Sequence, residues 1–410
     1  MALDITAARL NPGLFALPWS TPLEEWPLEV VAALPRGISR HVVRFVELEG
    51  EILAVKEIHE DLARKEYRLL HALDRMGEPA VDPVAVVAGR TDAAGRPLDA
   101  CLVTKHLPYS LPYRSLFSQS LRRATALKLI DAMAVLLTRV HMAGLFWGDV
   151  SLSNTLFRRD AGDFAAYVVD VETSELYDRL SDGQRAHDLH IAHGNVAGEL
   201  MDLIGGGLLP PEADPVAIAD QLVERYEGLW TNLTETETIS MDQHWRIAER
   251  IESLNRLGFD VGEIEVTTDI DGAHLRIQPK IVDAGHHSRR LMRLTGLDVE
   301  ENQARRLLND LDAFAASQGR QNDDESLLAH DWLSRIYEPI TRTVPAELRG
   351  RLEPAELFHE VLEHRWYLSE RADREYTIEE TIGEYLRDVL PSKRTEEVLL
   401  APKDGAGQPD

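Results

Sequence analysis

The chain has 410 residues and carries 44 Lys and Arg against 70 Asp and Glu, a formal net charge of −26. Its length predicts two or three domains of ordinary size, and a hydrophobic fraction of 44% is enough to give them packed cores. The negative charge argues against sequence-independent binding to nucleic acid or to anionic membranes, because both need clustered Lys and Arg.

The single cysteine, Cys101, excludes a disulfide within the chain and fits a reducing cytosol. The first residues lack the basic start and apolar core of a signal peptide. No run of 18 or more apolar residues is present, so we expect no membrane span. These features predict a cytoplasmic protein. The last ten residues, 401–410, are predicted to be a disordered tail.

The amino-terminal third predicts a small sheet with one inserted helix. The first 25 or so residues are interrupted by proline and are expected to be irregular or loosely packed. HVVRFVELEGEILAVKEI alternates and is β-branched, which predicts antiparallel strands at 41–48 and 51–58. HEDLARKEYRLLHALDRM has helical spacing, and AVDPVAVVAG and LDACLVTKHL predict two further strands.

The middle of the chain changes to helical periodicity. Residues 121–141 place apolar side chains along one side of a long helix. HMAGLFWGDVSLSNTLF follows, in which Asp149 precedes Asn154 by five positions on a Gly-containing turn. TLFRR and AAYVVDVE then predict a short hairpin that turns at DAGD. From about residue 184 the chain is mostly helical.

A third section starts near residue 238. TETISMDQHWRIAERIESLNRLGF is expected to be helical, and IEVTTDIDGAHLRIQPKI predicts a hairpin with Asp271-Gly272 as its turn. Three further segments have helical patterns. For the first of them, Asp298 with Glu301 three residues on forms a start that is typical of a capping box.

The acid and amide in the middle stretch suit phosphoryl transfer. This chemistry needs a group that orients the attacking hydroxyl, ligands for Mg²⁺ and a cation on the phosphates. Asp149 would orient the hydroxyl. Asn154 and a second acid would hold Mg²⁺, which prefers oxygen ligands. Asp170 fits this second role because it ends the β-branched strand in YVVDVE, one hairpin away from Asn154.

The amino-terminal sheet offers the cation. Lys56 lies near the end of the second strand, in ILAVKEI. Glu66 lies on the only helix of this part of the chain and is placed to hold Lys56. Gly37 stands on a turn before the first strand, where a backbone can approach a phosphate.

These motifs resemble those of the protein-kinase-like superfamily. ILAVK looks like the strand that carries the phosphate-binding Lys, and Glu66 looks like its helical partner. HMAGLFWGDVSLSN looks like the catalytic loop, and VVDVE like the strand that ends in the metal-binding Asp. The chain is most similar to the lipopolysaccharide (Kdo) kinase, RIO and aminoglycoside phosphotransferase branches, which use Gly-Asp or similar where typical protein kinases use Arg-Asp. Residues 238–395 resemble the DUF4032 domain of actinobacterial proteins.

The resemblance implies an α+β chain, with a two-lobed protein-kinase-like fold followed by a mainly helical carboxyl-terminal domain that contains a β-hairpin. The predicted domains are listed here: an amino-terminal segment at 1–27, a kinase-like domain at 28–235 with lobes at 28–108 and 109–235, and the helical domain at 238–395.

The resemblance also implies roles for the site residues. Lys56 would contact the α- and β-phosphates of ATP, with Gly37 near the phosphates and Glu66 holding Lys56. Asp149 would be the catalytic residue, with Asn154 and Asp170 on Mg²⁺. Backbone groups at Lys105, His106 and Leu107 would cradle adenine.

The implied function is ATP- and Mg²⁺-dependent phosphoryl transfer to a hydroxyl of an unidentified acceptor of small-molecule or glycan type. One alternative is a nucleotide-binding pseudokinase or scaffold whose carboxyl-terminal domain binds a protein partner. Another is an HD-type metal phosphohydrolase built on His187, Asp188, His190 and His193 in RAHDLHIAH. In a kinase-like fold, Asp188 would instead hold the backbone N–H groups of the catalytic loop.

The chain departs from protein kinases at four points. It has no Gly-x-Gly-x-x-Gly loop, Glu172 replaces the Gly of the metal-binding motif, Ser151 stands where Ser/Thr protein kinases usually carry Lys, and no Ala-Pro-Glu segment follows. The last three departures put protein substrates in doubt more than they put catalysis in doubt.

Overall fold

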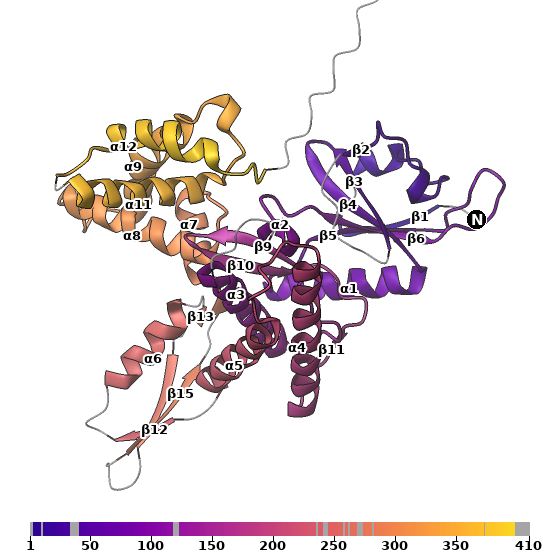
Figure 1. Cartoon of the computed structure of the whole chain (residues 1–410), viewed down its shortest axis with the longest axis horizontal. Coiled ribbons are helices and arrows are strands. Elements are labelled where there is room, and N and C mark those ends of the chain that lie inside the picture. Colours follow the sequence, from indigo (N-terminus) through magenta and orange to yellow (C-terminus); the bar gives the residue numbers. More distant parts are fainter. Residues whose placement is uncertain are drawn as a thin grey trace, which may run out of the picture.

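A computed structural model of the chain describes residues 3–9, 11–32, 41–117, 123–234, 237–240, 245–256, 259–260, 263–268, 274–280, 283–372 and 374–397. An amino-terminal sheet lobe, a central helical lobe and a carboxyl-terminal helical domain follow one another (Figure 1). The predicted α+β fold class, a two-lobed kinase-like fold followed by a mainly helical region, is confirmed. The predicted tail at 401–410 lies outside the described residues.

The amino-terminal lobe is a six-stranded antiparallel sheet in the order β1-β5-β6-β4-β3-β2. Its strands are β1 Asp4–Ala7, β2 Val31–Ala32, β3 Val42–Leu48, β4 Glu51–Ile58, β5 Pro83–Ala88 and β6 Ala100–Lys105. Glu49 and Gly50 both have positive φ at the turn between β3 and β4, as a tight two-residue hairpin requires. The predicted strands and the inserted helix, α1 Glu60–Met76, are confirmed.

The prediction that the first residues pack loosely is wrong. Strand β1 extends the sheet beside β5, and two short 3-10 helices, Pro12–Ala16 and Leu23–Glu25, follow it. Leu14, Trp19 and Trp26 are buried in one apolar cluster with residues of β3 to β6. Proline keeps long helices and strands out of residues 12–27, but the large apolar side chains of this stretch still cover the face of the sheet opposite α1.

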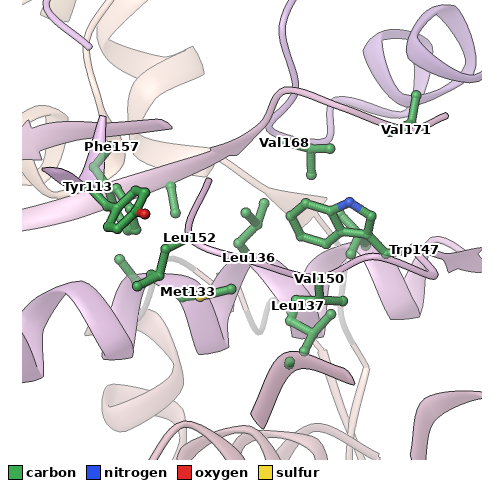
Figure 2. Packing of buried hydrophobic residues seen from close by; sticks show 14 of the residues in the cluster. Tyr113, Met133, Leu136, Leu137, Trp147, Val150, Leu152, Phe157, Val168 and Val171 are labelled. Carbon is green, nitrogen blue, oxygen red and sulfur yellow. The ribbon is translucent and has the colours of Figure 1, made fainter. Parts of the chain in front are cut away.

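The central lobe is built around one long buried helix. Its helices are α2 Tyr113–Phe117, α3 Arg123–Met142, α4 Asp182–Gly205 and α5 Pro215–Thr234, and its strands are β7 Leu111–Pro112, β8 Leu145–Phe146, β9 Thr155–Asp160, β10 Asp163–Val168 and β11 Glu175–Leu176. Figure 2 shows Met133, Leu136 and Leu137 of α3 grouped with Trp147 and Val150. The loop after α3 is therefore anchored in the core by its apolar side chains.

The carboxyl-terminal region begins with a small sheet. Its elements are β12 Glu237–Ser240, α6 Trp245–Arg256, β13 Phe259–Asp260, β14 Glu263–Thr268, β15 His274–Lys280, β16 Asp283–Ala284, α7 His286–Thr295, α8 Glu301–Ser317, α9 Glu325–Trp332, α10 Glu338–Arg342, α11 Pro354–Ala372 and α12 Ile378–Glu384. The predicted β14–β15 hairpin is confirmed, and its turn at Asp271-Gly272 lies outside the described residues.

Two predictions in this region are wrong. Residues 237–240 are not helical, because the β-branched pair Thr238-Ile239 extends as β12 and pairs with β15. Helix α8 begins two residues later than the Asp298 start implied, and its N-cap is Glu300. The side chain of Gln303 accepts a hydrogen bond from the N–H of Glu300 at 3.2 Å.

The apolar clusters divide the chain differently from the predicted domain limits. Leu254 and Phe259 pack in the same cluster as α3 and α5 of the central lobe. A separate cluster begins at Leu291 and runs to Leu390. The predicted domain limits remain a prediction. Within the described residues, no helix is both long and apolar enough to cross a membrane.

The tip of the β9–β10 hairpin docks on the carboxyl-terminal domain. Asp160 Oδ1 accepts a hydrogen bond from Gln303 N at 2.8 Å, and Oδ2 accepts from the backbone and side-chain nitrogens of Asn302 at 3.2 and 2.8 Å. Asp160 thus caps the first turn of α8 from another domain. In return, Glu356 of α11 accepts a hydrogen bond from Ala161 N at 2.8 Å.

Buried ion pairs surround this contact. Arg158 pairs with Glu300 at 2.9 Å and with Glu353 at 2.7 Å, and Arg159 pairs with Glu396 at 2.6 Å. All three carboxylate side chains are almost fully buried. Removal of one partner would leave a buried charge without compensation, so these pairs hold the two domains in one arrangement.

Replacement of Asp160 by alanine should destabilise the protein. The substitution leaves two backbone N–H groups and one side-chain amide of α8 without their acceptor, which costs about 1–3 kcal/mol of unfolding free energy. Asp163→Ala is the matched control, because the Asp163 carboxylate is exposed on the same hairpin and pairs with the half-exposed Lys128. Chemical denaturation of both variants measures the difference, and equal losses would contradict the capping role.

The stability of the docked state should fall as pH rises. Burial raises the pKa of Asp160 to about 8 and that of Glu353 to about 7, and the neighbouring Glu300 adds to both shifts. A carboxyl whose pKa is raised on folding stabilises the folded state below its unfolded pKa, and this stabilisation is lost as pH rises through the folded value. Melting temperatures should therefore decline between pH 5 and pH 8.5, and Glu353→Gln should flatten the decline. An identical pH profile for both proteins would show that Glu353 does not titrate in this range.

Candidate active site

The predicted cation lies in a cluster of acids. Lys56 Nζ lies 3.1 Å from Glu66 Oε2 and 2.7 Å from Asp170 Oδ2. A third acid, Glu172, lies 3.7 Å from Lys56 and also contacts His41 at 2.9 Å. Lys56 is on β4 and Glu66 on α1, while Asp170 and Glu172 follow β10. The sheet lobe and the central lobe therefore meet at this ammonium group.

The charged groups of this cluster shift one another's pKa values. Burial raises the pKa of Glu66 to about 7, and repulsion by Asp170 adds to the shift against the attraction of Lys56. Burial alone would lower the pKa of Lys56, but Glu66 and Asp170 outweigh this effect and raise it. Lys56 is therefore held as a cation at neutral pH, which suits a contact with anionic phosphates.

Asp149 and Asn154 lie together on the loop after α3. Asn154 Nδ2 donates to the backbone oxygen of Asp149 at 2.9 Å and to its Oδ2 at 3.2 Å. Gly148 has a φ of +79°, a conformation that favours glycine and lets the chain turn directly before Asp149. The amide of Asn154 thus points its nitrogen at Asp149.

The hairpin register brings Asn154 and Asp170 to one place. Thr155 pairs with Val168, and Val169 N donates to Asn154 O at 3.1 Å, which extends the ladder by one residue. Trp147 is fully buried, and its indole N–H donates to Asp170 O at 3.0 Å.

Asp188 supports the loop from below. Its Oδ2 accepts a hydrogen bond from Trp147 N at 2.7 Å, and its Oδ1 accepts from Gly148 N at 2.8 Å. His141 Nε2 lies 3.1 Å from the same carboxylate. The structure thus gives this fully buried acid the loop-holding position expected for it in a kinase-like fold.

Two further residues of α4 hold the loop, and the sequence reasoning missed both. Asn195 Nδ2 donates to Asp149 Oδ1 at 3.2 Å and to Val150 O at 3.0 Å. Glu199 accepts hydrogen bonds from Leu152 N at 2.7 Å and from Ser153 N at 2.9 Å. These residues follow Asp188 by 7 and 11 positions and therefore share its helix face. That spacing was the signal in the sequence that could have identified them.

The residues of the alternative hydrolase site point to different partners. His193 Nε2 lies 2.8 Å from Asp220, and the ring of His187 stacks on Phe146. Within the described residues, no group of three or more His, Cys, Asp or Glu side chains is arranged to hold a metal ion. The described structure therefore does not bring the His and Asp side chains of RAHDLHIAH together as a metal site.

The connection between the two lobes follows β6. The backbone N–H of Lys105 donates to Asp82 O and that of His106 donates to Ile52 O, both at 2.8 Å. These two N–H groups are engaged within the chain. Of the three residues expected to cradle adenine, only Leu107 has a backbone N–H with no acceptor among the described residues. The predicted phosphate contact at Gly37 lies outside the described residues.

One cleft of about 1270 Å³ between the lobes is lined by the predicted site residues Lys56, Glu66, Lys105, His106, Leu107, Asp149, Asn154 and Asp170. These residues come from β4, α1, the connection after β6, the loop after α3 and the end of the β9–β10 hairpin. The cleft is large enough for a nucleotide together with a second small molecule.

The fold and the cleft define a kinase-like domain, and the family comparisons agree. Residues 47–195 match the model of the lipopolysaccharide kinase (Kdo/WaaP) family, and residues 228–390 match the DUF4032 domain of unknown function. The chain therefore carries a Kdo/WaaP kinase family domain followed by a DUF4032 domain, as predicted.

A solved structure titled "WaaP in complex with acyl carrier protein" is also similar to this chain. It is 18% identical, with a TM-score of 0.37, and the match covers 63% of this chain and 99% of the WaaP chain. No curated protein matches the chain.

Replacement of Asp188 by asparagine should destabilise the loop. The carboxylate accepts from both Trp147 N and Gly148 N, but an amide has only one acceptor oxygen and would turn its NH₂ group toward one of these two N–H groups. The loss of this acceptor costs about 1–3 kcal/mol of unfolding free energy. Asp220→Asn is the control, because this acid lies on the surface of α5 and pairs with His193. Thermal and denaturant unfolding should separate the two variants, and a wild-type stability of Asp188→Asn would remove Asp188 from its supporting role.

Proposed function

We propose that this chain is an ATP- and Mg²⁺-dependent phosphotransferase that acts on a hydroxyl of a small-molecule or glycan acceptor. One observation carries the proposal: four segments of the chain bring Lys56, Glu66, Asp149, Asn154 and Asp170 into the lining of one cleft. A cation, a hydroxyl-orienting acid and two oxygen ligands are the parts that phosphoryl transfer requires.

The proposed magnesium ligands fit that ion. Asn154 directs its amide nitrogen to Asp149, so its side-chain oxygen is the atom left to face a metal. Asp170 is a carboxylate on the cleft wall. Mg²⁺ is commonly bound by one or two such oxygen ligands together with phosphate oxygens, and the ion would neutralise charge that develops on the phosphates.

The reaction then assigns a step to each side chain. Lys56, oriented by Glu66, binds phosphate oxygens of ATP. The acceptor hydroxyl oxygen forms a bond to the γ-phosphorus, the bond from that phosphorus to the bridging oxygen breaks, and ADP leaves. Asp149 orients the hydroxyl and accepts its proton. Asn195 and Asn154 hold the Asp149 carboxylate from two sides.

Asp149→Asn tests this assignment. The variant should bind ATP as the wild type does but lose about 10²- to 10⁴-fold in turnover, the usual contribution of a proton-accepting group. ATP hydrolysis and autophosphorylation are the readouts because they need no known acceptor, and calorimetry measures ATP binding. Asp170→Ala should instead weaken binding only when Mg²⁺ is present. Asp220→Asn, on the outer surface, is the control for both variants.

One observation favours a nucleotide-binding pseudokinase as the second candidate. Glu172 adds a third carboxylate within 3.7 Å of Lys56, where phosphates would bind, and so opposes the binding of anions. A wild-type protein that binds ATP tightly but neither hydrolyses it nor labels itself would favour this reading. The carboxyl-terminal domain would then serve to bind a partner protein. Activity that is unchanged in Asp149→Asn would overturn the catalytic assignment of Asp149.

A further inference from the structure

The carboxyl-terminal domain reaches into the cleft. Arg394, Thr395, Glu396 and Glu397 line the same cavity as Lys56 and Asp149. These four residues, called the wall segment here, follow the last helices of the DUF4032 match and are far from the kinase-like motifs in the sequence. A single cleft is thus lined by two domains.

The wall segment is fixed in place by several contacts. The backbone N–H groups of Glu396 and Glu397 both donate to Gly350 O, at 2.9 and 2.7 Å. The side chain of Glu396 is almost fully buried and pairs with Arg159 of β9 at 2.6 Å. The segment is therefore held both by its own domain and by the hairpin of the central lobe.

Its other contacts place it at one end of the cleft. Arg394 Nη1 donates to Ser115 O of α2 at 3.2 Å, and the hydroxyl of Tyr109 hydrogen-bonds to Glu397. Ser115 and Tyr109 belong to the stretch that directly follows Lys105–Leu107, where adenine is expected. The wall segment thus lies beside the nucleoside end of the cleft.

We propose that the wall segment forms part of the nucleotide site and contacts the base and ribose of a nucleoside triphosphate. The proposal rests on the phosphotransferase function proposed above. Arg394 and Thr395 are exposed and offer hydrogen-bond donors suited to ribose hydroxyls and ring nitrogens. Because nucleotide binding and domain docking share these residues, each stabilises the other to the same extent.

Gly350→Ala displaces the wall without altering any residue of the cleft. Gly350 has a φ of +79°, and an added Cβ would lie 2.6 Å from Glu397 Oε2 and 2.9 Å from Glu397 Cβ. Gly319→Ala is the matched control. It has a φ of +65° in the same domain and nothing within 4 Å of its Cβ, so it carries the same backbone strain without the displacement.

Calorimetric titration of the full chain with ATP and with adenosine measures the effect. Gly350→Ala should bind both ligands about 5-fold or more weakly than Gly319→Ala, the lower end of a typical coupling between sites. The KM for ATP should rise equally, and kcat at saturating ATP should stay unchanged. Arg394→Ala changes one exposed side chain and should also weaken adenosine binding. It is the deciding variant if Gly350→Ala fails to fold.

The outcomes separate the two proposals. If the wild type binds neither ATP nor adenosine, the proposed function fails and this inference fails with it. If the wild type binds both but Gly350→Ala and Arg394→Ala bind as tightly, only the inference is overturned. A fall in kcat with unchanged ligand affinity would also overturn it, because it would assign the wall to the acceptor end. As an independent readout, saturating ATP should slow tryptic cleavage after Lys393 and Arg394 by about 5-fold or more.

Discussion

The register of one two-stranded hairpin connects the candidate site to the carboxyl-terminal domain. Thr155 pairs with Val168 and Val169 N donates to Asn154 O, so Asn154 lies at the base of the hairpin beside the strand end that leads into Asp170. The opposite end of the hairpin, at Asp160 and Ala161, forms hydrogen bonds with α8 and α11. A hairpin alone is only marginally stable. This one is also supported along its length, because β7 pairs with β9 and Phe157 and Phe164 are buried in the core around α3.

The polar contacts between the β9–β10 hairpin and the carboxyl-terminal domain explain why the two domains adopt one relative position. The contact consists largely of hydrogen bonds and ion pairs between buried polar groups, with Arg158 and Arg159 on one side and a set of glutamates on the other. Two apolar surfaces can shift against each other without losing a specific partner. A buried charge that loses its partner, by contrast, strongly destabilises the protein. The acid excess of the whole chain, 70 Asp and Glu against 44 Lys and Arg, leaves few other cations for these glutamates.

The sequence was informative wherever function depends on local spacing. The meeting of Lys56, Asp149, Asn154 and Asp170 in one cleft could be predicted, because each lies near the end of a recognisable strand or shortly after a helix or strand. Their roles remain a prediction. Other features depend on contacts between distant segments, which periodicity does not report. Asn195 lies more than 40 residues after Asp149, and Trp19 and Trp26 cover a sheet that is formed later in the chain. Residues 237–240 were predicted to be helical, because the sequence around them does not show that β12 pairs with β15, a strand more than 30 residues later in the chain.

The loop that carries Asp149 is held from two directions that differ in kind. Its apolar side chains, among them Trp147 and Val150, are buried in the core around α3, which fixes the path of the backbone. Three polar side chains on one face of α4 accept or donate the hydrogen bonds that the loop cannot make with itself. The Asp149 carboxylate is thus oriented by packing below it and by amides beside it. Such preorganisation matters most for phosphoryl transfer, in which the protein contributes position and charge more than covalent chemistry. The same reasoning applies to the proposed role of the wall segment, because a segment that fixes the position of a bound nucleotide would add to this preorganisation.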